Sequence, residues 1–377
     1  MVKIGEPKVF VGMAALRLTR QRQKARSPME VARANPAPTR ERQPPRCAAS
    51  FLEVRDLWVR FRVDAGPEFT ILDRIGFDIA PGEIVGLLGE SGSGKTTMAL
   101  SLLRLLPPNA RVAGGSIQFR GRDLLSLNER QLREVRGAEL SLIYQDSSVL
   151  NPVMRVGDQV TEVVRAHHRW PMLRVREEAM AALAAVGLGG SDRIYTSYPH
   201  QLSGGQRQRI VIAQALVCKP DLVIADEPTA SLDATTAAEI VDLVKGLKTV
   251  SDTSFLFITH DPATLATLAD RVMVMYAGQI VEDGPLSEVY SQPQHPYTRA
   301  LLECAPRPPA GGGVRDRGFR LACIPGSPPD PMVTPPGCSF SNRCKDRMEI
   351  CDVRNPEEFR PSASRTVRCF KYGAEQP

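Results

Sequence analysis

Nine residues decide the fold: Gly89-Glu90-Ser91-Gly92-Ser93-Gly94-Lys95-Thr96-Thr97. They follow an apolar segment, 84–88, that predicts a strand, and they lead into a segment, 96–106, that predicts a helix. A glycine-rich loop in that position aims backbone N–H groups and a helix N-terminus at a phosphate. Lys95 then reaches the β- and γ-phosphates, and Thr96 places its hydroxyl on Mg²⁺. The stretch therefore predicts a phosphate-binding loop, the P-loop.

A second segment, Leu222-Val223-Ile224-Ala225-Asp226-Glu227, places two carboxylates directly after four apolar residues. This pattern is typical of a buried parallel strand whose carboxyl end opens onto a ligand. We expect Asp226 to hold the Mg²⁺ shell and Glu227 to polarise the attacking water. The alternative, a strand that merely ends in two solvated acids, is disfavoured by the P-loop on the same chain.

A third segment, Leu202-Ser203-Gly204-Gly205-Gln206, precedes a helical stretch at 207–216. A serine and two glycines at a helix N-terminus make a second phosphate cradle. The P-loop already provides one cradle on this chain. The second cradle is therefore expected to close on the nucleotide of another subunit.

With these motifs in this order, the sequence resembles the ABC ATPase family. Gln145, after Leu142-Ile143-Tyr144, looks like the Q-loop glutamine, and His260 looks like the switch histidine. Ser231-Leu232-Asp233 looks like the D-loop, and Phe61 resembles the aromatic residue that stacks on adenine. The resemblance implies that Glu227, His260 and Gln145 serve hydrolysis.

It also implies two sets of binding residues. Those that act in trans on a partner's ATP are the signature residues Ser203, Gly204, Gly205 and Gln206. Ser231 and Asp233 are assigned to the D-loop. Those that bind ATP and Mg²⁺ on this chain are Phe61, Gly89, Ser91, Gly92, Ser93, Gly94, Lys95, Thr96, Thr97, Gln145 and Asp226.

The fold implied by the resemblance is an α/β, RecA-like ABC ATPase core with a parallel sheet around the P-loop. An antiparallel β subdomain would come from about 51–80 and 116–120, and a helical subdomain from about 150–215 would carry the signature. Residues 51–290 would form the ATPase domain. Residues 291–377 would form a small Cys-rich C-terminal appendage, cored separately from the P-loop.

The chain carries one P-loop and one signature, so a complete pair of ATP sites requires a second ATPase subunit. The sequence contains no internal duplication. This argues against the ABC ATPases that act in translation, which resemble two tandem domains on one chain. Lys95 and Ser203 lie too close in sequence to enclose the long coiled coil of chromosome-structure and repair members. A transporter subunit is the class that remains.

Four further segments resemble the ATP-binding subunits of dipeptide and oligopeptide importers. They are Tyr198-Pro199-His200-Gln201, His295 to Leu302, Ile324 to Asp330, and Pro335 to Phe340. The resemblance implies a peripheral protein on the cytoplasmic face of the cell membrane. Its partners would be a second ATPase, two permeases and an extracytoplasmic solute-binding protein. Residues 145–152 depart from the family, since they look one residue short and lack the proline expected near position 147.

Charge bears on the remaining alternatives. Residues 1–50 hold eleven Lys and Arg against three Glu, whereas the whole chain has a net charge of +6, so the remainder is slightly acidic. We expect 1–50 to be a disordered basic extension, or to precede a later start at Met13 or Met29. A soluble ABC ATPase acting on nucleic acid or a protein assembly is disfavoured by the near-neutral body. An importer of nickel, glutathione or another small solute stays open, because the permease and the binding protein choose the cargo.

Four cysteines form a cluster in the last 40 residues, Cys338-x5-Cys344-x6-Cys351-x17-Cys369. A short segment rich in Pro and Arg needs a cross-link to hold a fold. Disulfides are disfavoured in the reducing compartment of an ATP-driven subunit, and the gaps are wide for a zinc knuckle. The remaining candidates are a 4Fe-4S cluster, which some members of this importer family carry, zinc, and unliganded thiols.

Overall fold

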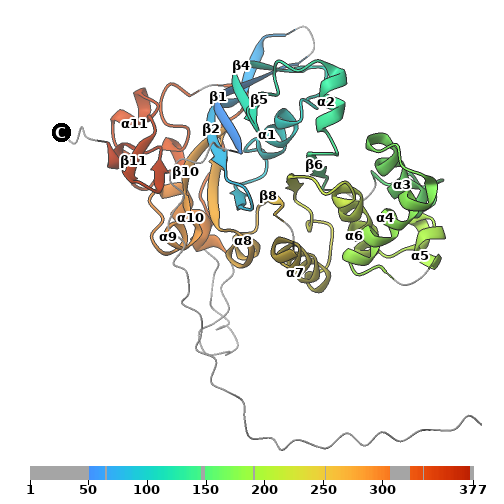
Figure 1. Cartoon of the computed structure of the whole chain (residues 1–377). Coiled ribbons are helices and arrows are strands. Elements are labelled where there is room, and N and C mark those ends of the chain that lie inside the picture. The colour runs from blue at the N-terminus through green and yellow to red at the C-terminus, as the bar shows by residue number, and fades with distance from the viewer. Residues whose placement is uncertain are drawn as a thin grey trace, which may run out of the picture. The chain divides into compact units, whose positions relative to one another are not determined.

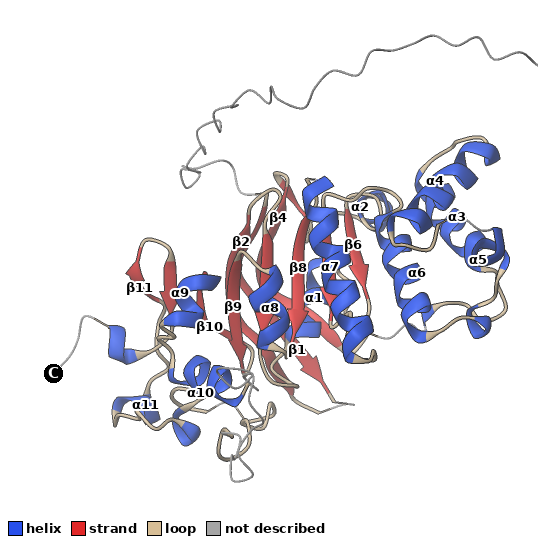
Figure 2. Ribbon diagram, turned by 90° about the horizontal axis from the view of Figure 1, so that it is seen from below, coloured by secondary structure: helices blue, strands red, loops and turns tan. Residues whose placement is uncertain are grey.

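An eight-stranded mixed sheet forms the centre of the computed structural model (Figures 1 and 2). The model describes residues 51–63, 66–145, 149–189, 192–250, 252–305, 323–333 and 335–373. The strand order is β11-β12-β10-β9-β3-β8-β7-β6, with parallel pairing from β9 through to β6. In that order the strands are Phe359–Ser362, Arg365–Val367, Gln279–Pro285, Arg271–Tyr276, Ile84–Leu88, Ser254–Thr259, Leu222–Asp226 and Leu140–Ile143.

The central strands β3, β7 and β8 are buried along their whole length, which explains their continuous apolar runs. Neighbouring residues face opposite layers: Ile84 and Leu88 join one apolar core, and Val85 and Leu87 join the other. The expected parallel sheet around the P-loop is therefore confirmed.

A second, antiparallel sheet has the strand order β2-β1-β4-β5. Its strands, in chain order, are Leu52–Arg62, Glu68–Ile79, Ala110–Phe119 and Arg122–Asp123. It shares one apolar core with helix α1, Lys95–Leu102, and with one face of the large sheet. This is the antiparallel subdomain that the sequence predicts.

Helices α3 to α6 gather beyond β6, at the opposite end of the large sheet from β11 (Figures 1 and 2). The helix α6 packs on α3, α4 and β6, so the signature helix belongs to both the helical group and the sheet. These four helices are Val156–His167, Met172–Ala185, Asp192–Thr196 and Gly204–Leu216. They match the predicted helical subdomain.

The other helices are shorter elements around the sheet, apart from the long α7. They are α2 Glu129–Val135, α7 Ala234–Val250, α8 Pro262–Leu268, α9 Leu286–Ser291, α10 Pro296–Cys304 and α11 Ile350–Val353. Short 3₁₀ turns occupy Pro199–Gln201, Ser341–Arg343 and Phe370–Tyr372. Within the described residues, no helix is both long and apolar enough to cross a membrane.

The Cys-bearing C-terminal region is built into the large sheet. Strand β12 pairs with β10 through Val367 opposite Glu282 and Thr366 opposite Asp283. The described residues from Phe51 onward form one compact unit. The expectation of a separately cored appendage is therefore not met, because two short strands that sequence patterns do not reveal complete the edge of the sheet.

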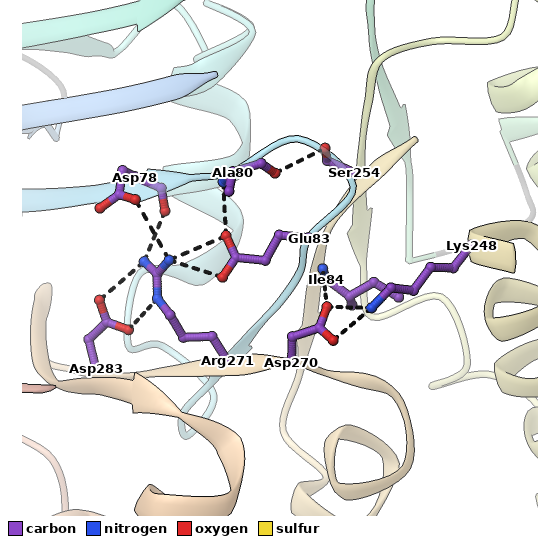
Figure 3. A network of polar contacts seen from close by, with 9 residues as sticks. All are labelled: Asp78, Ala80, Glu83, Ile84, Lys248, Ser254, Asp270, Arg271 and Asp283. Atoms are coloured by element: carbon purple, nitrogen blue, oxygen red, sulfur yellow. Dashed lines mark hydrogen bonds and ion pairs between the residues drawn. The ribbon is translucent and has the colours of Figure 1, made fainter. Parts of the chain in front are cut away.

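A polar network ties the two sheets together at one end (Figure 3). Arg271 Nε lies 2.8 Å from Asp283 Oδ1, and its Nη1 lies 3.1 Å from Glu83 Oε1. The same guanidinium donates to the carbonyl of Asp78 at the end of β2. Burial raises the pKa of Glu83 above its ordinary value. Arg271 of β9 is thus bound to β10, to the end of β2 and to the residue before β3. Because a buried charge without its partner is costly, these contacts hold the four strands in place relative to one another.

Candidate nucleotide-binding and hydrolysis site

The P-loop runs from the end of β3 to the start of α1, as the sequence predicts. Gly94 caps the helix with a φ of 104°, a conformation that side chains strongly disfavour. The Ser93 hydroxyl is buried and has no hydrogen-bond partner. The loop thus brings the N-terminus of α1 and an unsatisfied hydroxyl to the carboxyl edge of the sheet, where a phosphate can be bound.

Lys95 folds back onto its own loop. Its Nζ donates to the carbonyl oxygens of Gly89 and Glu90, at 2.9 Å in each case, and it lies 4.0 Å from Glu227 Oε1. Burial lowers the pKa of Lys95 below its ordinary value, although the nearby carboxylates oppose this. The ammonium group therefore stands at the mouth of the P-loop, held by carbonyls that a phosphate can replace.

Asp226 ends β7 and is almost fully buried, with 4% of its surface exposed. Burial raises the pKa of its carboxyl group, and a hydrogen bond from the Thr96 hydroxyl opposes that rise. One carboxylate oxygen, Oδ1, has no partner. A buried, unsatisfied carboxylate oxygen beside a hydroxyl is the donor set that Mg²⁺ takes from a protein when nucleotide phosphates and waters supply its other ligands. The predicted Mg²⁺ residues fit that ion.

Glu227 takes a positive φ of 46° immediately after β7. Such strain in a non-glycine residue costs roughly 1–3 kcal/mol and is found mainly at functional sites. Here it turns the carboxylate toward β8, where its Oε2 lies 3.0 Å from Nδ1 of His260. Lys95, Glu227 and His260, which are far apart in the chain, are thereby brought together at one edge of the sheet.

Gln145 follows β6 and is exposed. No described residue contributes a hydrogen bond to its side chain. Residues 146–148 of the shortened loop lie outside the described residues. The roles of Gln145 and of that loop stay predictions.

The signature begins α6 and is closed by its own side chains. Ser203 Oγ accepts from the amide of Gln206 at 3.3 Å, and Gln206 Oε1 accepts from the amide of Ser203 at 3.0 Å. This capping box occupies two of the orphan donors of the helix and leaves the N–H groups of Gly204 and Gly205 for another acceptor. Within the described chain, no hydrogen bond or ion pair joins these residues to the P-loop. The in-trans role of the signature stays a prediction.

The D-loop lies beside the signature. Asp233 caps α7 by accepting from the amide and the hydroxyl of Thr236, at 3.0 and 2.8 Å. The hydrogen bond from the Thr236 amide is the main reason why the pKa of Asp233 is below its ordinary value. A β-carbon added to Gly204 would lie 4.0 Å from Leu232 Cδ2. The residue between Ser231 and Asp233 therefore lies near the signature within one subunit, and the D-loop roles of Ser231 and Asp233 stay predictions.

Phe61 is partly buried near the end of β1, with its ring centroid 6.3 Å from that of Phe69. A cavity of about 500 Å³ lies next to P-loop residues 90–93, and β1 lines it through Trp58. Trp58, which no sequence motif singled out, lies three residues before the predicted stacking aromatic. Phe61 stays the predicted adenine contact.

Two further residues at the P-loop come from the C-terminal region. The Tyr297 hydroxyl accepts from the amide of Glu90 at 2.9 Å. Arg343 grips the Glu90 carboxylate with both terminal nitrogens, Nη1 to Oε2 at 2.8 Å and Nη2 to Oε1 at 3.0 Å. Neither contact could be expected from the sequence, because 207 and 253 positions separate these residues from Glu90.

The four clustered cysteines lie close to one another. Burial raises the pKa of Cys338 to about 11, and the charges of Cys351, Cys369 and Cys344 contribute to that rise. The amide of Cys338 also donates to the carbonyl of Cys351 at 2.8 Å. All four are free thiols. In the part of the chain that is described, no three His, Cys, Asp or Glu residues are grouped tightly enough to hold a metal ion.

Comparison with known proteins agrees with this geometry. Residues 72–230 match the family model described as ABC transporter, and residues 281–351 match the Oligopeptide/dipeptide transporter, C-terminal region. The chain is 42% identical over 321 residues to the dipeptide transport ATP-binding protein DppD of Bacillus subtilis, covering 85% of this chain and 94% of that one. It is 42% identical over 331 residues to the oligopeptide transport ATP-binding protein OppD of Salmonella typhimurium, covering 87% and 96%.

Solved structures give the same fold. The dimeric ATP-binding cassette MJ0796, in a post-hydrolysis state bound to ADP and Pi, matches with a TM-score of 0.56 and 25% identity over 62% of this chain and 98% of that chain. The structure of cbiO1 from Clostridium perfringens, part of an ABC transporter complex, matches with a TM-score of 0.55 and 26% identity over 64% and 91%.

Proposed function

Because the chain belongs to the family of dipeptide and oligopeptide transport ATP-binding proteins, we propose that it hydrolyses ATP to energise an importer of di- and oligopeptides. One observation carries the proposal. Lys95, Glu227 and His260 meet at the carboxyl edge of the sheet. Lys95 Nζ lies 4.0 Å from Glu227 Oε1, and His260 Nδ1 lies 3.0 Å from Glu227 Oε2. A cation for phosphate, a base for water and an orienting imidazole are the groups that phosphoryl transfer to water requires.

Each residue has a defined part in this proposal. Lys95 exchanges the carbonyls of Gly89 and Glu90 for the β- and γ-phosphates of ATP. Glu227 orients the attacking water and accepts its proton, while His260 holds the carboxylate in place. Thr96 and Asp226 would hold Mg²⁺, which when bound neutralises charge on the phosphates.

The partners follow from what the chain itself contains. A single P-loop and a single signature require a second ATPase subunit, whose ATP would meet Ser203, Gly204 and Gly205. Transport also requires two permease subunits and a solute-binding protein, so the chain would act at the cytoplasmic face of the membrane as a peripheral subunit. A direct role on nucleic acid is not proposed, because the charge outside residues 1–50 is slightly negative.

We also propose that Cys338, Cys344, Cys351 and Cys369 hold a 4Fe-4S cluster. The Cys338 amide donates to the carbonyl of Cys351 at 2.8 Å, and the 3₁₀ turn Ser341–Arg343 leads from Cys338 to Cys344, which supports a shared set of thiol donors. A cubane is larger than a single ion and accepts thiolates that are too far apart for zinc. The cluster would be structural or redox-sensing. Anaerobically purified protein should be brown and contain iron and acid-labile sulfide in near-equal amounts, whereas colourless protein with one zinc per chain would contradict the proposal.

The transport function is tested by purification from membranes. Tagged full-length chain, extracted from solubilised membranes, should bring down a second ATPase and two multi-span proteins. Its ATPase rate in liposomes should rise when peptide-loaded binding protein is added. Stimulation by nickel or glutathione instead of peptide would support the nearest alternative. A chain that purifies alone, and whose ATPase rate responds only to DNA or RNA, would contradict transport.

A further inference from the structure

Glu90, the second residue of the P-loop, is held at three of its polar groups. Its carboxylate accepts two hydrogen bonds from Arg343, its amide donates to the Tyr297 hydroxyl, and its carbonyl accepts from Lys95 Nζ at 2.9 Å. Two of these three partners belong to the C-terminal region. These contacts restrict the backbone at the start of the phosphate loop, and the contacts from Arg343 and Tyr297 come from outside the ATPase core.

The Arg343 side chain is itself tightly placed. Only 5% of it is exposed, its Nε donates to the carbonyl of Pro325 at 2.9 Å, and its Nη1 donates to the Tyr276 hydroxyl at 3.3 Å. Its Cζ lies 5.8 Å from the centroid of the Tyr276 ring, and the rings of Tyr276, Tyr297 and Phe340 pack on one another with centroids 4.5 to 5.4 Å apart. A bidentate, largely buried ion pair of this kind is sensitive to the loss of either partner.

The backbone that carries Arg343 belongs to the cysteine cluster. Its 3₁₀ turn, Ser341–Arg343, lies between Cys338 and Cys344. The Ser341 amide donates to the carbonyl of Cys338, and the Cys344 amide donates to the carbonyl of Ser341, at 3.0 and 3.2 Å. The position of the guanidinium therefore depends on how these cysteines are held.

We propose that Arg343 is a positioning residue for the P-loop, which acts through Glu90 and sets the ATP affinity of this chain according to the state of the four-cysteine region. The inference rests on the proposed ATPase function. A loop that is already ordered loses less conformational freedom when a phosphate enters it. Removal of Arg343 should thus raise the Kd and the KM for ATP more than it lowers kcat.

The test measures ATP binding by the full-length protein together with its thermal unfolding. Arg343→Met should weaken ATP binding about tenfold or more, with kcat little changed. The double variant Glu90→Gln/Arg343→Met should bind no more weakly than Arg343→Met, because both remove the same contact. Arg343→Lys keeps the charge but not the two-pronged guanidinium, so its ATP affinity should lie between those of the unmodified protein and Arg343→Met. It replaces Arg343→Met in the test if that variant does not fold.

Arg347→Met is the matched control. Arg347 lies in the same segment between Cys344 and Cys351, but it pairs with Asp352 near the surface. It should bind ATP like the unmodified protein. The link to the cysteines is tested by Cys338→Ser, which should weaken ATP binding in the natural background and add little in the Arg343→Met background.

Three results would overturn the inference. They are unchanged ATP affinity in the Arg343 variants, additive effects of Glu90→Gln and Arg343→Met, and a lowered Tm with no change in Kd, which would indicate a merely structural pair. Failure of the unmodified protein to bind ATP would instead contradict the proposed function.

Discussion

Gly205 of the signature lies against Thr236 of α7 so closely that a β-carbon at position 205 would stand 2.5 Å from Thr236 Cγ2. The neighbouring Gly204 is different, since the nearest atom to its added β-carbon is 4.0 Å away on Leu232. The Thr236 amide also donates to the Asp233 carboxylate that caps α7. The second glycine of the signature is therefore required by packing against the D-loop helix within the same subunit.

Gly205→Ala should lower the Tm, because the new methyl group displaces α7 from the signature. Overpacking of this kind typically costs about 1–3 kcal/mol. Thr236→Ser in the same protein should restore the Tm, since serine removes Cγ2 but keeps the hydroxyl that Asp233 accepts. Gly204→Ala is the control and should be at least as stable as the unmodified protein. Equal stability of the two alanine variants would refute the packing argument.

Lys95→Ala and Ser203→Arg should separate the two phosphate cradles. Loss of Lys95 removes the charge that faces the β- and γ-phosphates, so ATP binding to this chain should weaken severely. Ser203→Arg should leave that binding largely intact and block closure on the partner's nucleotide. Equilibrium titration with ATP measures the first effect, and ATP-dependent association with the partner ATPase measures the second. Loss of its own ATP affinity by the Ser203 variant, to the extent seen for Lys95, would contradict action in trans.

His295 should make the fold sensitive to acid. Burial lowers its pKa to about 3, and its Nδ1 accepts from the Tyr297 amide at 3.0 Å. The unfolded chain binds this proton below about pH 6.5, whereas the folded chain does not, so stability falls as the pH drops from 6.5 toward 3. His295→Asn, which can still cap the helix, should lose about 1 kcal/mol less unfolding free energy between pH 6 and pH 5.

Urea unfolding at fixed ionic strength measures this difference. The exposed His200 provides the control, and His200→Asn should follow the unmodified protein across the same range. A His295→Asn protein with the original pH slope would show that this imidazole is already protonated in the fold.

The sequence predicted those parts of the site that are formed by residues close together in the chain. The P-loop, the strand ending in Asp226 and Glu227, and the serine cap of α6 each lie within a few residues of chain, where strand, turn and helix signals act. His260 and Glu227 could be expected at one edge because parallel strands bring their carboxyl ends together. Their 3.0 Å contact depends on the strained backbone of Glu227, which no sequence pattern predicts.

The contacts across the C-terminal region could not be predicted in the same way. Strand β12 has three residues, and Arg365, which it buries, pairs with the fully buried Glu282 of β10 at 2.5 Å. From sequence alone, a charged residue is expected to face solvent unless a buried partner is known. For the same reason the Arg343–Glu90 pair could not be predicted. The C-terminal region was therefore expected to have a hydrophobic core separate from that of the P-loop domain.

We propose Glu227 as the base for ATP hydrolysis, and the Glu227→Gln variant examines that role. The amide keeps the shape of the side chain but cannot accept the proton, so steady-state turnover should fall by about 10² to 10⁴-fold. ATP binding should persist, and the ATP-bound complex with the partner ATPase should accumulate. Glu134→Gln, a change at an exposed side chain on α2, should leave turnover unaltered. Normal turnover by the Glu227→Gln protein would show that Glu227 is not the base.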